Sequence, residues 1–499
     1  MMLRLAGGAL LIALFATVAS ATTFFEDVGI ISDAIGGGVL IKSKALAPTY
    51  AGQPVTILIL GSDSRAESHV IYDRSDPQHS DTIILMRMNP NSGQTTLMSV
   101  PRDLEVSFTA NGGEYTDQKI TTAYTYGGAT ATLRVVKNLL HIKINDIIVI
   151  DFQAFAFLTN GLGCVYVDVD HLYDSGPYAD YAHIYIPPGY RPLCYYQALS
   201  YVRYREGDST YARDAREQDF IRQAKQQLGI RTSLLTNPND LKRLLRSAGH
   251  GISTNIHGED AVLRLIEIAE SSIDHPVHQV QFPDDGSVYT PSGGSEQVDP
   301  PPAQIAATVH EFLYGTSSAS LPSVSQATNA AHSHHHHHKV HSTLSPTSLG
   351  LVETASYALQ DAREMSVSVP FPVEIPHYTS PAGTQNDSDD FYAFKEVVPL
   401  LATFGGLHYS GYRITWEDSA APAGAYYGID GLNWTDPPLF NSAPTRRIDG
   451  RTYEFVENGT HYQDIGWIVG KDIYWVSNTL FDNLSNDTML ALAESSSPL

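Results

Sequence analysis

The 499-residue sequence is poor in basic residues, since Lys and Arg total 31 against 54 Asp and Glu, and the formal net charge is −23. A protein that binds nucleic acid broadly needs an excess of basic charge to displace counterions from the phosphates. The composition therefore argues against a nucleic-acid partner. If the protein handles phosphate, its cations must be gathered locally against an acidic background.

Several catalytic motifs are missing as well. The sequence has no glycine-rich Walker loop, so a nucleotide is not indicated, and it has no GxSxG motif, HExxH motif or Cys/His pair. It has only two cysteines, Cys164 and Cys194, and no CxxC pattern that would bind a metal. In an oxidising compartment two such cysteines often pair, so they are a candidate disulfide; the alternative is two small buried side chains without a bond.

What the sequence does have is a globular composition, with 42% hydrophobic and 17% charged residues. It begins with an uncharged apolar stretch from Leu5 to Phe25, preceded by Arg4. This stretch is long enough to span a bilayer, so residues 1–25 are predicted to be a membrane anchor, which makes the protein single-pass in the cell membrane. Alternatively, Ala19-Ser20-Ala21 is a signal-peptide cleavage site and the protein is secreted. Both interpretations place the remaining chain outside the cytoplasm.

Strand and helix patterns alternate over residues 50–315, which predicts a layered α/β domain. The run Val55–Leu60 is continuously apolar and ends at Gly61, as a strand buried on both faces does. Further strands are expected at 81–88, 94–100 and 144–152, and helices at 122–140, 196–204 and 214–228.

The composition changes after residue 315. Residues 316–347 are rich in Ser, Ala, Thr and Pro and contain the run His334–His338, so a disordered linker is predicted. The histidines favour a solvated tract over a metal site, because no fixed geometry holds them. Residues 349–495 contain all four tryptophans and are predicted to form a smaller C-terminal α+β domain of unknown role. Its aromatic residues form either the core, which we favour, or a sugar-stacking platform.

Two aspartates stand where the predicted strands meet polar segments. Asp63 follows the first apolar run, and Asp81 opens the next strand. Open α/β sheets bind ligands at strand ends, and one or two carboxylates suffice to hold Mg²⁺ against a substrate phosphate. The alternative is that both are ordinary turn residues.

A set of arginines accompanies these acids. Arg65 and Arg102 follow strand ends, and four more crowd into fourteen residues: Arg203, Arg205, Arg213 and Arg216. The planar guanidinium binds phosphate oxygens bidentately and keeps its charge when desolvated. Acids for a metal and arginines for phosphate together indicate phosphoryl transfer, in which positioning and charge neutralisation are decisive.

These acids and arginines, with the motifs that surround them and in their order along the chain, resemble the LytR-CpsA-Psr family of cell-wall ligases. The resemblance covers residues 52–315 and leaves out 316–499. It is carried by the following stretches: Leu58-Ile59-Leu60-Gly61-Ser62-Asp63-Ser64-Arg65, Ser80-Asp81-Thr82, Ser99-Val100-Pro101-Arg102-Asp103, Lys119-Ile120, Ala123-Tyr124, Gly127-Gly128, Asp151-Phe152, Gly161-Leu162-Gly163, Gln197-Ala198-Leu199, Tyr201-Val202-Arg203-Tyr204-Arg205, Arg213 and Arg216.

The resemblance implies an α/β/α sandwich around a mixed sheet, with an apolar groove for a polyprenyl chain. It implies a phosphotransferase that moves a glycopolymer from a polyprenyl-pyrophosphate carrier onto a peptidoglycan hydroxyl, with a polyprenyl pyrophosphatase side activity. Asp63 and Asp81 would bind Mg²⁺ (or Mn²⁺). Arg102 would be catalytic with Asp103, which orients it or acts as a general base. The pyrophosphate would be bound by Arg65, Arg203, Arg205, Arg213, Arg216 and Glu217.

Three positions depart from the family pattern. Glu217 stands where the family has Gln, Thr210 stands where it has Asp, with Asp208 nearby, and Cys164 interrupts a Gly-Gly-Val sequence. A carboxylate at 217 repels a bound phosphate unless it is paired. This leaves two alternatives: a polyprenyl-phosphate-binding or regulatory envelope protein with weakened catalysis, and a wall-binding structural protein led by its C-terminal domain.

Overall fold

The computed structural model describes residues 40–63, 78–176, 184–228, 251–272, 275–284, 288–289, 297–315, 345–380, 383–384, 391–397, 408–418 and 425–499. The predicted membrane segment 1–25, Arg65 and the linker up to residue 344 lie outside these ranges. Within them, no helix is long and apolar enough to cross a membrane.

The first half of the chain is built on a six-stranded mixed sheet with the order β11-β6-β1-β2-β3-β12. β1 runs parallel to β6 and antiparallel to β2. The strands are β1 (Val55–Ser62), β2 (Ser80–Met88), β3 (Thr95–Ser99), β6 (Asp146–Asp151), β11 (Ile252–Thr254) and β12 (Val277–Val280). The predicted strands are therefore present, within two residues of their expected ends. The mixed sheet expected from the family resemblance is confirmed.

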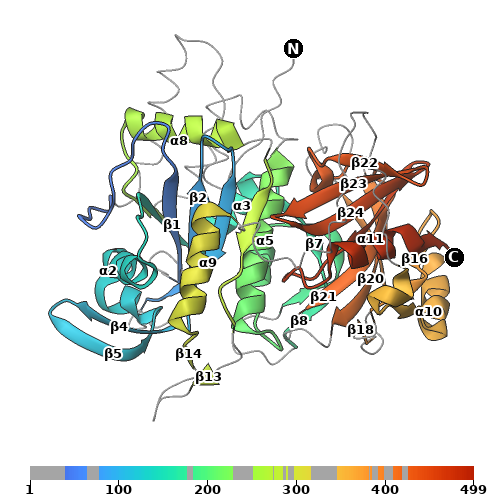
Figure 1. Ribbon diagram of the computed structural model, residues 1–499, viewed down its shortest axis with the longest axis horizontal. Coiled ribbons are helices and arrows are strands. Elements are labelled where there is room, and N and C mark those ends of the chain that lie inside the picture. Colours follow the sequence, from blue (N-terminus) through green and yellow to red (C-terminus); the bar gives the residue numbers. More distant parts are fainter. Residues whose placement is uncertain are drawn as a thin grey trace, which may run out of the picture.

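Helices cover both faces of this sheet (Figure 1). One face packs against α3 (Phe152–Gly161), α4 (Tyr195–Arg203), α5 (Thr210–Leu228) and α8 (Glu259–Ser272). The other packs against α2 (Thr122–Leu140) and α9 (Pro302–Tyr314). Burial on both faces is why β1 is apolar without alternation. α5 begins at Thr210, four residues before its predicted start at 214. The first turn of the helix is largely polar, so the apolar spacing in the sequence did not reveal it.

Short ladders extend from this sandwich. They are the hairpin β4 (Glu105–Ala110) with β5 (Gly113–Lys119), β7 (Val165–Val169) with β10 (Gly189–Leu193), β8 (Tyr173–Asp174) with β9 (Tyr185–Ile186), and β13 (Val288–Tyr289) with β14 (Gln297–Val298). The β4–β5 hairpin turns at Asn111-Gly112, both of which have positive φ. An Asn-Gly pair is a strong hairpin signal, but the polar sequence of β5 hides the strand itself.

Cys164 and Cys194 form a disulfide across a sequence separation of 30 residues. Cys164 directly precedes β7, and Cys194 is the N-cap of α4. The bond therefore ties the start of α4 to the β7–β10 ladder, and α4 ends at Arg203. This accounts for the cysteine that interrupts the Gly-Gly-Val pattern.

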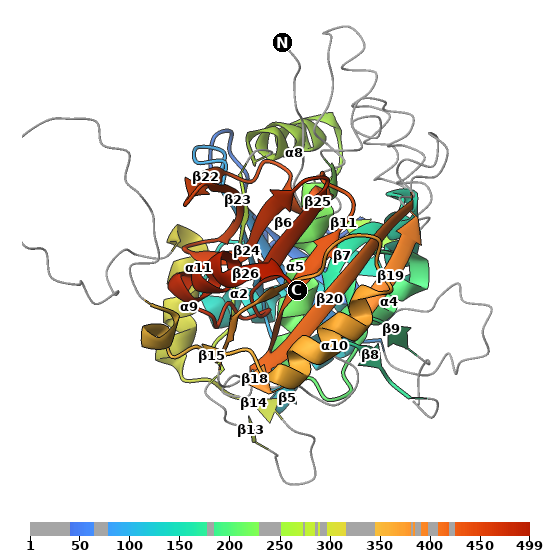
Figure 2. The same ribbon diagram turned by 90° about the vertical axis from the view of Figure 1, so that its right-hand side faces the viewer.

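The C-terminal part forms an eight-stranded antiparallel sheet, which faces the viewer in Figure 2. Its strands are β18 (Gly383–Thr384), β19 (Phe391–Val397), β20 (His408–Asp418), β21 (Tyr426–Leu432), β22 (Thr445–Ile448), β23 (Arg451–Asn458), β24 (His461–Val469) and β25 (Asp472–Ser477). Residues of α10 (Ser356–Ser366) and α11 (Asn486–Ser495) pack with it in one core. Smaller elements complete it: η2 (Pro346–Leu349), η4 (Pro438–Phe440), β15 (Val352–Glu353), β16 (Glu374–Pro376), β17 (Tyr378–Thr379) and β26 (Ser496–Pro498).

The tryptophans of this part are core residues. Trp416, Trp434, Trp467 and Trp475 are between 0% and 9% exposed. The Nε1 atoms of Trp467 and Trp475 donate to the buried carboxylates of Glu374 and Asp168. The tryptophans therefore leave no exposed sugar-stacking face, and the interpretation favoured from the sequence is confirmed.

The β7–β10 ladder and α5 of the first part pack against the C-terminal sheet at a buried interface (Figure 1). Tyr166 and Tyr190 of the first part pack in one aromatic cluster with Tyr409, Trp434 and Trp475 of the second. A second row of contacts is polar: Arg222 on α5 lies 3.6 Å from Asp464 on β24. The C-terminal sheet is thus packed directly against the helix that also carries candidate site residues.

Candidate active site

An apolar cavity lies between the first sheet and the helices α3, α4 and α5. Together with the part that is open to solvent, its empty space measures about 830 Å³. The sheet contributes Ile59, Ile84 and Ile148 to the lining, and the helices contribute Phe155 and Phe220. Such a lining accepts a hydrocarbon chain and offers it almost no polar partner.

Four polar side chains line one part of this cavity. They are Thr82, Asp151, Arg203 and Glu217. Arg203, at the end of α4, lies with its guanidinium carbon 4.0 Å from the centre of the Phe152 ring, a cation–π contact that fixes the charge beside the cavity. The site therefore combines an apolar cavity with charged residues at its edge. This combination is complementary to a lipid with a charged headgroup.

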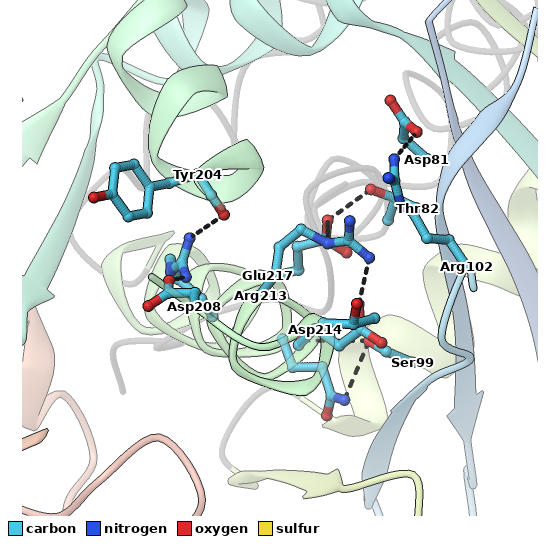
Figure 3. A network of polar contacts seen from close by, with 12 residues as sticks. Asp81, Thr82, Ser99, Arg102, Tyr204, Asp208, Arg213, Asp214 and Glu217 are labelled. Carbon is cyan, nitrogen blue, oxygen red and sulfur yellow. Dashed lines mark hydrogen bonds and ion pairs between the residues drawn. The ribbon is translucent and has the colours of Figure 1, made fainter. Parts of the chain in front are cut away.

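Arg102 is the centre of an ion-pair cluster next to this boundary. Its Nη1 donates to Asp81 Oδ1 at 2.6 Å, and its Nε lies 3.5 Å from Asp103 Oδ2. Asp103 in turn accepts from Lys119 Nζ at 2.6 Å and from the Thr210 hydroxyl at 3.2 Å. Asp103 thus holds Arg102 in place, and the Thr210 found where the family has Asp takes part in the same cluster. Figure 3 shows the Arg102–Asp81 pair.

The electrostatics show that other arginines lie close to Asp81. Burial by itself would raise the pKa of Asp81, but Arg102, Arg203, Arg205 and Arg213 outweigh it and hold that pKa below its ordinary value. Burial and the neighbouring charges of Arg102 and Arg213 likewise lower the pKa of Arg205. Four of the six predicted arginines therefore lie close enough to Asp81 to act on its charge, an arrangement that suits an anion.

Glu217 closes the cluster from α5. Its carboxylate accepts a hydrogen bond from Thr82 Oγ1 at 2.8 Å and lies 3.8 Å from Arg213 Nε (Figure 3). Arg213 also donates to Asp214 at 3.1 Å. Burial, more than the opposing effect of Arg213, raises the pKa of Glu217 to about 8. At neutral pH residue 217 is therefore mostly an uncharged acid, which has the shape of the Gln it replaces and removes the expected repulsion of phosphate.

This gives a prediction for pH dependence. The folded-state pKa of about 8 lies above the ordinary value of 4.5. The free energy of unfolding therefore falls as pH rises from about 4.5 to 8, and above pH 8 it stays at its lowered value. Glu217→Gln should leave stability at pH 5 nearly unchanged and raise the free energy of unfolding at pH 9, by an amount on the order of a few kcal/mol. Urea unfolding at both pH values measures this.

The matched control for this prediction is Glu353→Gln, because Glu353 is exposed on β15. It should change stability at neither pH. Equal effects of Glu217→Gln at pH 5 and pH 9 would mean that residue 217 does not titrate as described.

Arg216, which was predicted to bind pyrophosphate, lies apart from this cluster. Its guanidinium is fully buried, forms an ion pair with Asp208, and donates to the carbonyl oxygens of Tyr201 and Tyr204. Figure 3 shows Tyr204 and Asp208 well apart from Asp81 and Arg102. Positions 213 and 216 lie only about 60° apart around a helix, so it is the contacts with Asp208, Tyr201 and Tyr204 that hold the Arg216 guanidinium away from the cluster. Arg216 anchors the loop between α4 and α5 instead.

Asp63 lies at the end of β1, beside the start of β2. It accepts a hydrogen bond from the backbone N–H of His79 at 2.6 Å, and its second oxygen lies 3.7 Å from His79 Nδ1. Asp151 ends the neighbouring strand β6 and caps α3 by accepting from Ala154 N at 2.7 Å. Among the described residues no group of three His, Cys, Asp or Glu side chains is arranged to hold a metal. The donors present are carboxylates at adjacent strand ends, a set that suits Mg²⁺ only when phosphate oxygens complete it.

Three residues of the cluster were not predicted as site residues from the sequence. Lys119 and Thr82 lie within stretches that carry the family resemblance, but neither received a role there, and Thr210 was noted only as a departure. Each belongs to the cluster because it donates a hydrogen bond to one of its acids, Asp103 or Glu217. The partners of Thr82 and Thr210 lie 135 and 107 residues away, and that of Lys119 lies 16 residues away across a hairpin. Proximity in sequence to motif residues does not reveal such partners.

Comparison with known proteins agrees with the resemblance. The model of the LytR_cpsA_psr family matches residues 38–300. A protein from Halalkalibacterium halodurans named polyisoprenyl-teichoic acid–peptidoglycan teichoic acid transferase TagU is 32% identical over 174 residues, which are 34% of this chain and 52% of that protein. A TagU of the same name from Enterococcus faecalis is 27% identical over 255 residues, 51% of this chain and 78% of that protein.

Among solved structures, TagV of Bacillus subtilis aligns with 54% of this chain and all of its own (100%), at 22% identity and a TM-score of 0.41. The Streptococcus agalactiae protein gbs0355 aligns with 54% of this chain and 91% of its own, at 25% identity and a TM-score of 0.45. The chain spans about half the length of the first relative, and residues 301–499 lie outside the family match.

Proposed function

Because the chain belongs to the LytR_cpsA_psr family, whose model matches residues 38–300, we propose that it is a phosphotransferase that moves a glycopolymer from a polyprenyl-pyrophosphate carrier onto a peptidoglycan hydroxyl. The relatives' names, which pair a polyisoprenyl-linked teichoic acid with peptidoglycan, support this substrate class. The observation that carries the proposal is the gathering of Arg102, Arg203, Arg205 and Arg213 beside an apolar cavity.

In this proposal the lipid chain enters the cavity and its pyrophosphate meets the arginines at the boundary. The acceptor hydroxyl oxygen attacks the phosphorus that bears the sugar. A P–O bond forms, the bond to the bridging oxygen breaks, and polyprenyl phosphate leaves with the proton. Because negative charge accumulates on the leaving phosphate, the Arg102 guanidinium, held in advance by Asp81 and Asp103, stabilises the transition state without rearranging. The same site acting on water would give the pyrophosphatase side reaction.

Asp103 fits the role of a positioning residue better than that of a general base. Burial would raise its pKa, but Arg102 and Lys119 hold the pKa below its ordinary value. A carboxylate with a lowered pKa takes up a proton poorly at neutral pH. We therefore assign Asp103 to the orientation of Arg102 and Lys119.

The proposal includes Mg²⁺, or Mn²⁺ in its place, held by Asp63 and Asp81 together with substrate oxygens. When bound, the ion would supply positive charge to the pyrophosphate. Asp81 also binds Arg102, so the ion and this arginine would share one carboxylate. We further propose that residues 5–25 keep the protein at the membrane, where the lipid carrier resides.

The test uses the purified full-length protein with a lipid-linked glycopolymer and peptidoglycan sacculi. Polymer should become covalently attached to the sacculi while polyprenyl phosphate is released. EDTA should lower the rate at least about 10²-fold, because phosphoryl transfer depends on charge neutralisation at the metal, and added Mg²⁺ should restore it. A rate that EDTA leaves unchanged removes the metal from the mechanism, and the absence of attached polymer removes the proposed function.

A further inference from the structure

The β4–β5 hairpin rises directly out of the ion-pair cluster. It starts two residues after Asp103 and ends at Lys119, and the Lys119 Nζ–Asp103 Oδ1 pair at 2.6 Å closes its base. In the hairpin Glu105 pairs with Lys119, and Phe108 pairs with Tyr115. At about 3.3 Å per residue, the Phe108–Tyr115 pair lies roughly 10 Å from the base. A ligand that extends from the reacting phosphate by a sugar or two can therefore reach this level.

At that level three aromatic rings are stacked. The ring centres of Phe108 and Tyr115 are 5.2 Å apart, and those of Tyr115 and Tyr126 are 4.1 Å apart with an angle of 22° between the planes. Phe108 is at the buried end, while Tyr126, on the first turns of α2, is 39% exposed. The stack therefore presents an aromatic ring to solvent on a base that is anchored in the core.

This stack is held rigidly by its surroundings. Asn111 at the hairpin turn donates through Nδ2 to the backbone oxygen of Tyr126 at 2.6 Å. A Cβ atom at Gly127 would lie 2.5 Å from Cβ of Ala131 and 3.1 Å from Cβ of Ala110, so a glycine here allows the close packing of α2 and the hairpin end. Gly128 then breaks the helical backbone with φ 62° and ψ −164°. A rigid ring loses little entropy when a ligand covers it, so the arrangement suits binding.

The charges on the hairpin disfavour an anionic ligand at the stack. The hairpin carries Glu105, Glu114 and Asp117, and its basic residue Lys119 is engaged by Asp103. The other exposed side chains of the hairpin are mainly neutral hydroxyls: Ser107, Thr109 and Thr116. An apolar ring face bordered by neutral hydrogen-bonding groups matches a neutral pyranose, which has an apolar C–H face and a rim of hydroxyls.

We propose that Tyr126, supported by Tyr115 and Phe108, is a stacking subsite for a neutral sugar of the glycan that is joined at the neighbouring phosphate site. This inference rests on the proposed function for its reaction, since it places a sugar next to a reacting phosphate. Two sources share the chemistry: the N-acetylhexosamine backbone of the acceptor, and the neutral sugars nearest the pyrophosphate of the donor. An exposed aromatic platform thus exists in the first part of the chain, and the C-terminal tryptophans do not supply it.

The test is a calorimetric titration of the full-length protein with chitotetraose, a soluble β-1,4-linked N-acetylglucosamine oligomer. Tyr126→Ala should weaken binding about tenfold, as the loss of roughly 1.4 kcal/mol of stacking implies. Tyr126→Phe keeps the ring and should bind as the unchanged protein does. Tyr50→Ala is the matched control, because Tyr50 is 65% exposed and lies outside the hairpin. If Tyr126→Ala proves unstable in a thermal melt, Tyr115→Leu replaces it with the same expected loss.

The transfer reaction then separates the two sources. A KM for sacculi that rises about tenfold in Tyr126→Ala with kcat preserved assigns the subsite to the acceptor, and the same rise for the lipid-linked substrate assigns it to the donor. Unaltered chitotetraose binding in Tyr126→Ala, or no binding by the unchanged protein, overturns the subsite. The titration needs no turnover, so an inactive protein that binds the oligosaccharide through Tyr126 would refute the proposed transfer and leave the subsite standing.

Discussion

Replacement of Arg102 by alanine is expected to lower glycopolymer transfer about 10³-fold, with the protein still folded. Its guanidinium bridges Asp81 and Asp103, and its side chain is 16% exposed. Arginines that stabilise transition-state charge in phosphoryl transfer contribute about 10³- to 10⁵-fold to the rate. Loss of Arg102 also frees Asp81, whose carboxylate would then repel the pyrophosphate. The rate of polymer attachment to sacculi, measured at saturating donor, gives the size of the effect.

Two further variants sharpen this test. Arg102→Lys keeps the charge but cannot span Asp81 and Asp103 with a planar fork, so it should recover only a small part of the rate. Arg134→Ala, at an exposed position on α2, should transfer normally. Turnover in Arg102→Ala equal to that of Arg134→Ala would falsify the assignment of Arg102 as a catalytic residue.

Replacement of Arg413 by alanine is expected to be the most destabilising single change at the interface between the two sheets. Arg413 is fully buried on β20 and donates to Asp168 at 3.0 Å, Asp430 at 2.5 Å and Ser477 at 3.0 Å. Its Nε donates to the carbonyl oxygen of Asp170 at 2.9 Å. Burial raises the pKa of both Asp168 and Asp430, and Arg413 is the cation that opposes this effect in each.

Without Arg413, two carboxylates remain in a dry interface with no opposing charge beside them. Removal of one partner of such a buried pair costs about 3–5 kcal/mol, and urea unfolding should show a loss of this size. Arg447→Ala, at an exposed site on β22 of the same sheet, should be neutral. Asp430→Asn added to Arg413→Ala should restore part of the loss, since one unpaired charge disappears. A loss of less than about 1 kcal/mol in Arg413→Ala would contradict the role of this arginine as the interface cation.

The first sheet was predictable because its signals are local. Val55–Leu60 is a continuous apolar run, and such a run needs cover on both faces to be stable, so it predicts a central strand and the helical layers around it. The acids and arginines at the strand ends were visible for a related reason, because polar residues that stop a buried strand stand at the rim of the sheet. The β4–β5 hairpin was missed since the residues of β5 face water and carry no apolar alternation.

The roles of individual arginines depended on packing. Arg213 and Arg216 look equivalent in a sequence, yet one lies beside Glu217 and the other is enclosed by Asp208, Tyr201 and Tyr204. Likewise, the protonation of Glu217 follows from its burial and its neighbours, which no spacing rule reports.

Residue order alone thus established a covered mixed sheet, a rim with acids and arginines, and membership in a family. Folding settled which guanidinium groups lie close to Asp81, that the C-terminal sheet packs on α5, and that an exposed tyrosine stands against the hairpin that starts at the Asp103–Lys119 ion pair. The division has one cause. Strand and rim signals arise from neighbours along the chain, whereas an ion pair or a ring stack is made by residues that only the packing of distant segments brings within a few ångströms of each other.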